Sequence, residues 1–157
     1  MLQDVDNQTR AQWMGLLARA PLAVLQAWAS RNADGAPQYT WLRKPETGLA
    51  MVRARAGGTG DKFNLGEMTL TRCALRLAGG SGGGAVGVAY IQGRSHRKAE
   101  LAALADACLQ DVRLRERVRE ELLAPLAVRL EAEAARMQRK AQATRVEFFT
   151  LARESGA

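Results

Sequence analysis

The chain has 157 residues, 47% of them hydrophobic and 5% aromatic, and a formal net charge of +7 at pH 7. This length suits a single domain over residues 1–157 with one core, and no stretch reaches the roughly 20 consecutive apolar residues that span a bilayer. The opening residues also lack the basic and then apolar pattern of a secretory signal, so we expect a cytoplasmic protein without a membrane partner.

Two helices are expected at the N-terminal end, within residues 8–32. Thr9 and Gln12 have the spacing of a capping box, which favours a helix start there. Pro21 interrupts this first helix and is well suited to the first turn of a second one. The turn-forming residues 32–35 are then expected to end the second helix.

Residues 38–93 form the predicted strand region, because the apolar period changes there from helical to alternating. The expected strands are residues 39–43, 49–56, 68–77 and 85–92. Alternation puts one group of residues on the same face of the second strand: Leu49, Met51, Arg53 and Arg55. In the third strand it separates the face of Thr69, Thr71, Cys73, Leu75 and Leu77 from that of Met68, Leu70, Arg72, Ala74 and Arg76. Loops this short join antiparallel neighbours, since a parallel return needs a crossover of about a dozen residues or more. The sequence therefore predicts an α+β fold, in which N-terminal helices and a C-terminal helical segment flank an antiparallel meander of about four strands.

The C-terminal part returns to the helical period, and helices are expected over residues 95–141. Ser95 is the expected N-cap of the first of them. The tail at 144–153 carries Phe148 and Phe149 where a chain end is usually polar. We therefore expect this tail to dock on the sheet of this domain or on a partner.

Few residues have the types and spacings that support catalysis or metal binding. The chain has one histidine, His96, and two cysteines, Cys73 and Cys108, at positions that match no metal-binding motif and no catalytic triad. We expect both cysteines to be reduced thiols in the core. The sequence thus predicts no metal site, and it leaves the catalytic residues unknown.

Four arginines in the strand region are candidate contacts for an anion or an acidic partner: Arg53, Arg55, Arg72 and Arg76. We hypothesise that they share one face of the sheet, where clustered like charges are unfavourable unless an acidic group lies on them. In the alternative interpretation they rim the sheet in water or pair with the nearby acids Glu46, Asp61 and Glu67.

The glycine-rich stretch between two of these strands has two interpretations. Its residues are Gly57, Gly58, Thr59 and Gly60. Glycine lets several N–H groups converge on one anion, and it equally allows a tight turn between strands. The stretch lacks the spacing of a Walker A loop, so no phosphate motif of known mechanism decides between them.

Several segments, taken in chain order, closely resemble the PhnG family, the G subunits of the bacterial carbon–phosphorus lyase core complex. The matching segments are residues 10–14, 46–49, 53–60, 63–72, 92–94, 99–100, 106–107, 124–126 and 144–150. They cover nearly the whole chain, and their shared order makes the resemblance more specific than any single motif.

This resemblance implies a role in phosphonate utilisation within a protein complex. In the family, the G subunit works with the H, I and J subunits and functionally with the L subunit. The set displaces adenine from ATP by a phosphonate, so ATP is a substrate of the complex, and no cofactor is expected on this chain alone. The family motif identifies no catalytic residue in the G subunit, so the resemblance implies a non-catalytic or co-catalytic subunit that the complex requires as a structural partner. The stretch 57–60 would then shape a loop for subunit contact, with substrate phosphate as the second option.

Two other classes of protein remain as alternatives. A nucleic-acid-binding module would account for the basic charge, but no aromatic residues interleave with the central arginines to stack on bases, so no nucleic-acid partner is expected. A stand-alone enzyme acting on a small molecule is the other alternative, and turnover by the purified chain would identify it.

Overall fold

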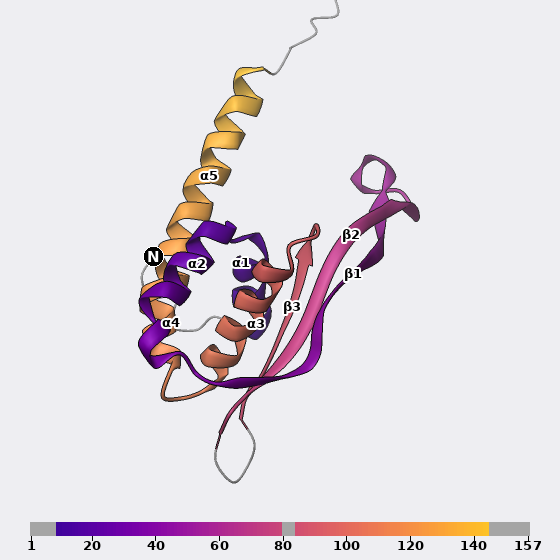
Figure 1. The fold of residues 1–157 in the computed structure, drawn as a ribbon. Coiled ribbons are helices and arrows are strands. Elements are labelled where there is room, and N and C mark those ends of the chain that lie inside the picture. The colour runs from indigo at the N-terminus through magenta and orange to yellow at the C-terminus, as the bar shows by residue number, and fades with distance from the viewer. Residues whose placement is uncertain (1–8, 80–83, 145–157) are drawn as a thin grey trace, which may run out of the picture.

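The computed structural model describes residues 9–79 and 84–144, and in them helices cover one face of an antiparallel sheet (Figure 1). The predicted α+β class is confirmed. The predicted tail residues Phe148 and Phe149 lie outside the described residues. No helix in the described part of the chain combines the length and the apolar character that crossing a membrane requires.

The two N-terminal helices form as predicted, as α1 (Arg10–Arg19) and α2 (Leu22–Arg31). At the start of α1, the main-chain N–H of Thr9 donates to the Gln12 side chain at 2.6 Å, which is half of a capping box. Pro21 is the N-cap of α2, where its missing N–H costs no hydrogen bond. A single 3₁₀ turn, η2 (Ala33–Gly35), then leads into the sheet.

Within the described residues, the sheet has three strands and not the expected four: β1 (Tyr39–Arg55), β2 (Lys62–Leu77) and β3 (Val86–Gln92). The first two predicted strands are one continuous strand, because Lys44 and Pro45 do not form a turn. The pairing register instead shifts between Arg43 and Glu46. Pro45 is tolerated because β1 lies at the edge of the sheet, where a missing N–H need not break a ladder hydrogen bond.

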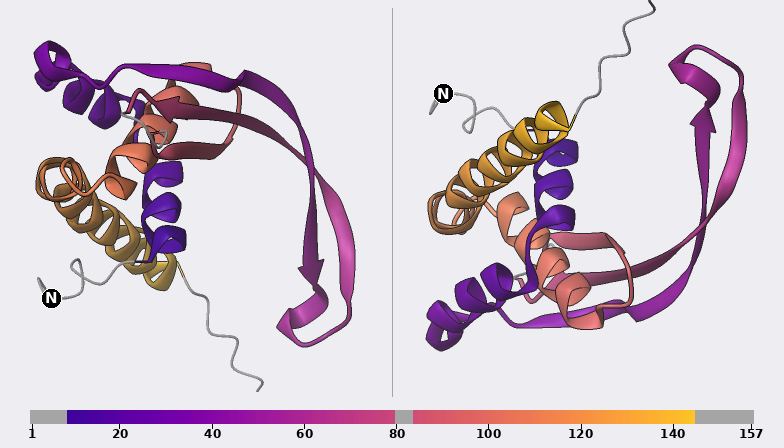
Figure 2. Two further views of the ribbon diagram at one scale, coloured as in Figure 1. Left: turned by 90° about the horizontal axis from the view of Figure 1, so that it is seen from below. Right: turned by 90° about the horizontal axis from the view of Figure 1, so that it is seen from above.

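The strands differ greatly in length, and this leaves part of the sheet as a two-stranded ribbon. β3 pairs with β2 from Leu70 to Arg76, whereas β1 and β2 continue to the pair Arg55 and Lys62. We call residues 48–70 the arm. Figures 1 and 2 show that the arm curves beyond the helices and that no other element lies against its far end.

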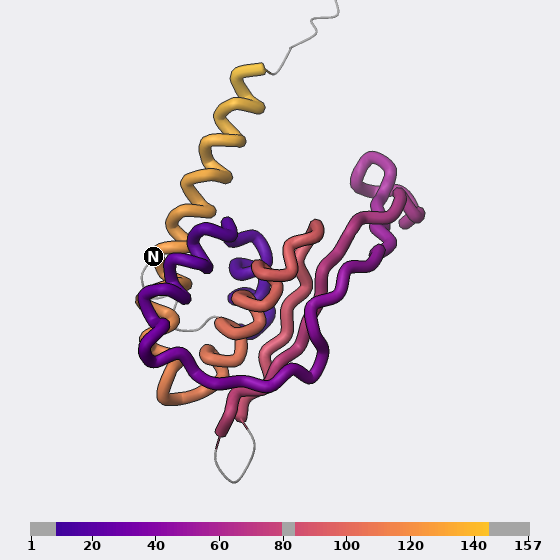
Figure 3. Tube along the Cα trace, viewed as in Figure 1, coloured from indigo at the N-terminus to yellow at the C-terminus, as the bar shows by residue number. Residues whose placement is uncertain are grey.

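The C-terminal half consists of helices, which Figure 3 follows along the Cα trace. They are α3 (His96–Gln110), α4 (Arg115–Val118), the π-helical η4 (Arg119–Leu123) and α5 (Ala124–Ala143). The predicted N-cap is confirmed, because the Ser95 hydroxyl accepts a hydrogen bond from the Lys98 N–H at 3.3 Å. In α5, where every residue is described, Leu126 alone is buried, so this helix extends away from the core.

The core lies between α3 and the sheet, with α1 and α2 closing its sides. Every residue of α3 from 101 to 109 is buried. The facing residues of the sheet are Thr71, Cys73, Leu75, Leu77, Ala89 and Ile91. They alternate along β2 and β3 as strands require, so the prediction that Thr71, Cys73, Leu75 and Leu77 share one face of β2 is confirmed.

Cys73 and Cys108 are both buried free thiols, as predicted. Burial raises the pKa of each thiol to about 12 from an ordinary 9.0. The thiolate, which is the reactive form, is therefore scarce at neutral pH. We expect both thiols of the folded chain to react slowly with iodoacetamide at pH 8, and quickly once urea unfolds the chain.

The same pKa shift makes stability depend on pH in the alkaline range. The unfolded thiols ionise above about pH 8.5, whereas the folded thiols stay neutral. Their contribution to stability is complete below that pH and is lost as the pH rises toward 12.

The slow alkylation of the folded chain is tested by mass spectrometry of the alkylated chain with and without urea. Fast labelling of either cysteine in the folded chain would contradict the burial of the thiols.

Candidate functional site

The root of the arm brings together three of the segments that carry the family resemblance. Thr47 on β1 lies opposite Thr71 on β2, and Gly93 follows the adjacent end of β3. His96, the first residue of α3, reaches the same place from the helix layer. These segments are distant in the sequence, and the sheet register is what brings them together.

A chain of hydrogen bonds joins the four residues at the root. The Thr71 hydroxyl donates to the Gly93 carbonyl at 2.6 Å. Because a hydroxyl has one hydrogen to donate, the contact of 3.1 Å between Thr47 and Thr71 must have Thr47 as its donor. The contact of 3.0 Å between His96 Nε2 and Thr47 Oγ1 must then have His96 as its donor. His96 therefore holds the arm to the body through Nε2–H and is not arranged as a general base at that nitrogen.

A charged cluster lies beside this chain on the outer surface of the strands. Glu46 Oε1 accepts hydrogen bonds from Arg72 Nε at 2.7 Å and from Arg43 Nη1 at 2.8 Å. Hydrogen bonding to Arg72 and then to Arg43 lowers the pKa of Glu46. The three side chains are about half exposed, so their pairing adds little to stability. Next to them is a hollow of about 300 Å³ lined by Glu46, Thr47, Gly48, Leu49, Leu70 and Arg72.

The four candidate arginines do not share one face, and this part of the hypothesis was wrong. On β1, Arg53 and Arg55 lie on the face that continues the core, whereas Arg72 and Arg76 on β2 lie on the outer face. The alternation within each strand was predicted correctly. What differs is the pairing between strands, because the register shift between Val52 and Arg53 decides which faces of β1 and β2 coincide.

The predicted ion pairs are present for one arginine only, among the residues that the structure describes. Arg72 pairs with Glu46, as the alternative interpretation expected. Neither Arg53 nor Arg55 forms an ion pair with Glu67 or Asp61. The Arg55 guanidinium instead donates to the Gly60 carbonyl at 3.0 Å.

The glycine-rich stretch forms the tip of the arm. Gly57 and Gly58 have φ angles of 58° and 81°, which are left-handed values that favour glycine. The Gly60 N–H donates to the Ala56 carbonyl at 3.0 Å and closes the turn. These residues reverse the chain between β1 and β2, so the turn interpretation is confirmed. Contact of 57–60 with a subunit or a phosphate stays a prediction.

Large apolar side chains are exposed along the arm. Leu49 and Met51 lie on the face that α3 covers further down the sheet, but the helices end before them, and they are 65% and 50% exposed. Near the tip, Phe63 is 44% exposed and Leu65 is 63% exposed. Solvent-facing strands usually carry polar residues at such positions, so these side chains indicate a surface for another molecule.

A second pair of resembling segments meets inside the body, at Asp106 of α3. This side chain is fully buried. It accepts hydrogen bonds from Arg10 Nη2 at 2.8 Å, from Trp13 Nε1 at 2.8 Å and from the Val88 N–H at 2.9 Å. Asp106 therefore ties α1, α3 and β3 together and is a structural residue of the core.

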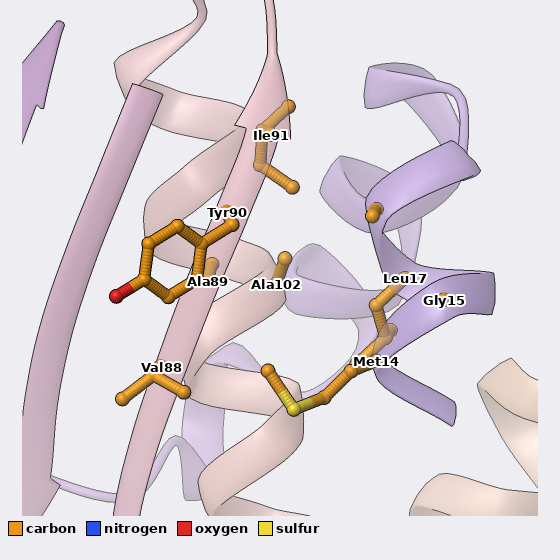
Figure 4. Close-up of a pocket in the computed structure, with 9 residues that line it drawn as sticks. Met14, Gly15, Leu17, Val88, Ala89, Tyr90, Ile91 and Ala102 are labelled. Carbon is orange, nitrogen blue, oxygen red and sulfur yellow. The ribbon is translucent and has the colours of Figure 1, made fainter. Parts of the chain in front are cut away.

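The same network covers part of the exposed edge of β3. The Val86 carbonyl accepts from Arg10 Nη2 at 3.1 Å and from Gln110 Nε2 at 2.8 Å. Edge strands otherwise offer such groups to other chains. Beyond this covered part, a hollow of about 220 Å³ separates β3 from α1, with Met14 and Leu17 on one side and Ile91 on the other (Figure 4). This hollow is apolar and carries no chemistry of its own.

The described residues offer no arrangement typical of catalysis or metal binding. No group of three or more His, Cys, Asp or Glu side chains in 9–79 and 84–144 could hold a metal ion. His96 uses one ring nitrogen to hold Thr47, and both cysteines are buried. The exposed apolar side chains of the arm make its surface the candidate functional site.

Sequence reasoning missed the two networks that position this site. Asp106 stands within an apolar run of α3, and a single acid in such a run signals a buried partner of opposite charge. Thr47 and Thr71 gave no comparable signal, because their contact depends on the strand register. Leu49 and Met51 were correctly predicted to share one face of their strand, but their lack of a covering helix was not predicted.

Comparison with known proteins agrees with the resemblance seen in the segments. The family model for phosphonate metabolism protein PhnG matches residues 8–154. A curated protein from Rhizobium meliloti (strain 1021), named alpha-D-ribose 1-methylphosphonate 5-triphosphate synthase subunit PhnG, is 44% identical over 151 residues. The alignment covers 96% of this chain and 92% of that protein. The chain belongs to the PhnG family of phosphonate metabolism proteins.

Proposed function

We propose that this chain is a subunit of an alpha-D-ribose 1-methylphosphonate 5-triphosphate synthase. The observation that supports this most is its relation to a curated subunit of that name, which extends over 96% of the chain. Similarity over nearly the whole of both proteins implies that they share the fold and its surfaces. A shared role as a subunit of the same kind of assembly is the simplest explanation.

The chain is proposed to act with the H, I and J subunits, and functionally with the L subunit, in the transfer of a phosphonate to the ribose C1 of ATP with release of adenine. ATP is then a substrate of the complex, and this chain alone holds no cofactor. The residues that the structure describes support a non-catalytic part, because His96, Asp106 and the buried thiols all have structural roles.

Reconstitution with the other subunits tests this function. The H, I and J homologues from the same genome, with L, are expressed with and without this chain, and phosphonate-dependent release of adenine from ATP is measured. We expect copurification of the chain with the other subunits and release of adenine only in its presence. Full release without the chain, or release by the chain alone, would contradict the proposal.

A further inference from the structure

One face of the arm carries no charged residue, although no described element covers its far end. Its outer face consists of Gly48, Ala50, Val52, Ala54, Phe63, Gly66, Met68 and Leu70, and none of these residues is charged. Its other face begins with the exposed Leu49 and Met51. An isolated two-stranded ribbon is marginally stable in water, so such a surface is stabilised when another molecule covers it.

The charges on the arm are unevenly placed. Arg55 lies directly opposite Lys62, and Arg53 lies next to them on the same face. Like charges directly opposite each other are unfavourable unless a negative group lies near them. Glu67 is on this face, opposite Met51, but it forms no ion pair with these three cations in the part of the chain described.

From these two features we infer that another subunit of the synthase receives the arm in a cleft. One wall of this cleft is apolar and lies against the uncharged outer face. The other wall is apolar opposite Leu49 and Met51, and acidic opposite the cluster of Arg53, Arg55 and Lys62. The inference rests on the proposed function and adds the surface and the chemistry of its contact.

The dimensions of the arm agree with a specific interface. The arm contains residues 48–55 of β1 and 62–70 of β2, which at about 3.3 Å per residue gives a length of about 26–30 Å. Two faces about 10 Å wide then offer roughly 600 Å² of the arm, or about 1,200 Å² when both partners are counted, at the lower end of specific interfaces. A bound phosphate would satisfy the cations but would leave the apolar side chains exposed, which is why a protein fits better.

The apolar part of the contact is tested with Met51→Asp and its matched control Val112→Asp. Val112 is 81% exposed, follows α3 and lies outside the arm. Each full-length variant is expressed with H, I and J, and the amount of partner recovered per chain is measured. We expect at least about a tenfold loss for Met51→Asp and unchanged recovery for Val112→Asp. Circular dichroism of both variants checks that they are folded.

The cationic part is tested with the double variant Arg53→Glu/Arg55→Glu against Arg53→Lys/Arg55→Lys. The glutamate variant is expected to lose about tenfold in recovery, and the lysine variant, which keeps the charge, to stay near the wild type. Recovery of the wild type should fall as salt rises, because part of the contact is electrostatic. Equal recovery of partner with the glutamate and lysine variants would contradict the inference that one wall of the cleft is acidic.

The outcomes separate this inference from the proposed function. If the wild type copurifies with its partners and Met51→Asp does so equally well, the arm is not the contact, although the chain remains a subunit. If the wild type forms a dimer on its own that Met51→Asp disrupts, a second copy covers the arm, and the inference is overturned. If the wild type binds none of the partners, the proposed function itself fails.

Discussion

Replacing Asp106 with alanine is expected to lower the free energy of unfolding by about 3–5 kcal/mol, because it leaves two partly buried N–H donors without an acceptor, at about 1–3 kcal/mol each, and removes the hydrogen bond from the partly exposed Arg10. The fully buried Asp106 carboxylate accepts hydrogen bonds from Arg10, from Trp13 and from the main chain of Val88. The donor–acceptor distances are 2.8 Å to Arg10 Nη2, 2.8 Å to Trp13 Nε1 and 2.9 Å to the Val88 nitrogen. Alanine would leave the indole N–H and the Val88 N–H without acceptors in the core. Urea unfolding followed by circular dichroism measures the loss.

Glu133→Ala is the matched control for this prediction. Glu133 also pairs with an arginine, Arg129 at 3.0 Å, but both side chains are exposed on α5. Exposed pairs of this kind contribute about 0.3–0.5 kcal/mol. If Asp106→Ala costs no more than Glu133→Ala, the network does not hold α1, α3 and β3 together.

Replacing Gly87 with alanine is expected to cost about 3 kcal/mol, because β3 and α3 approach each other too closely there for a side chain. A Cβ at Gly87 would lie 1.9 Å from the Ala103 carbonyl oxygen and 2.8 Å from the Ala107 Cβ. Both neighbours belong to the buried helix, so the helix or the strand must move, and overpacking of this kind destabilises a core. Urea unfolding measures this cost as well.

Gly48→Ala is the matched control for Gly87→Ala. Both glycines lie in strands, but a Cβ at Gly48 would meet nothing within 4 Å. Strand interiors tolerate alanine better than glycine, so we expect a change below about 1 kcal/mol. Equal costs at the two positions would show that the close approach of β3 to α3 does not limit residue size.

The elements could be predicted largely from local sequence signals. The alternation along β2 predicted which of its residues share a face, and Ser95 and Pro21 were correctly placed at helix starts. These features depend on neighbouring residues, so a single sequence contains the information. The predicted break between residues 43 and 49 was wrong for the opposite reason, because Lys44 and Pro45 are tolerated within β1 only since that strand lies at the edge of the sheet, which local sequence does not reveal.

The site could be predicted less well, because it depends on how distant strands pair. Arg53 and Arg72 were each grouped correctly with the residues that share their face within their own strand, yet the register shift between Val52 and Arg53 sets which faces of β1 and β2 coincide. The exposure of Leu49 depends on where α3 lies, which is a property of the packed molecule. The residues that share one face of a strand can therefore be predicted from local sequence. The surface that stays exposed depends on the packed fold and cannot.

Amide hydrogen exchange of the arm, residues 48–70, is the most direct test of the view that this chain works by being covered in an assembly. It is measured in the isolated chain and in the complex with the H, I and J homologues. The arm of the isolated chain should exchange fast, and assembly should slow it by about a hundredfold or more, while α3 stays protected in both samples. An arm that exchanges equally fast in the chain alone and in the complex would contradict this account.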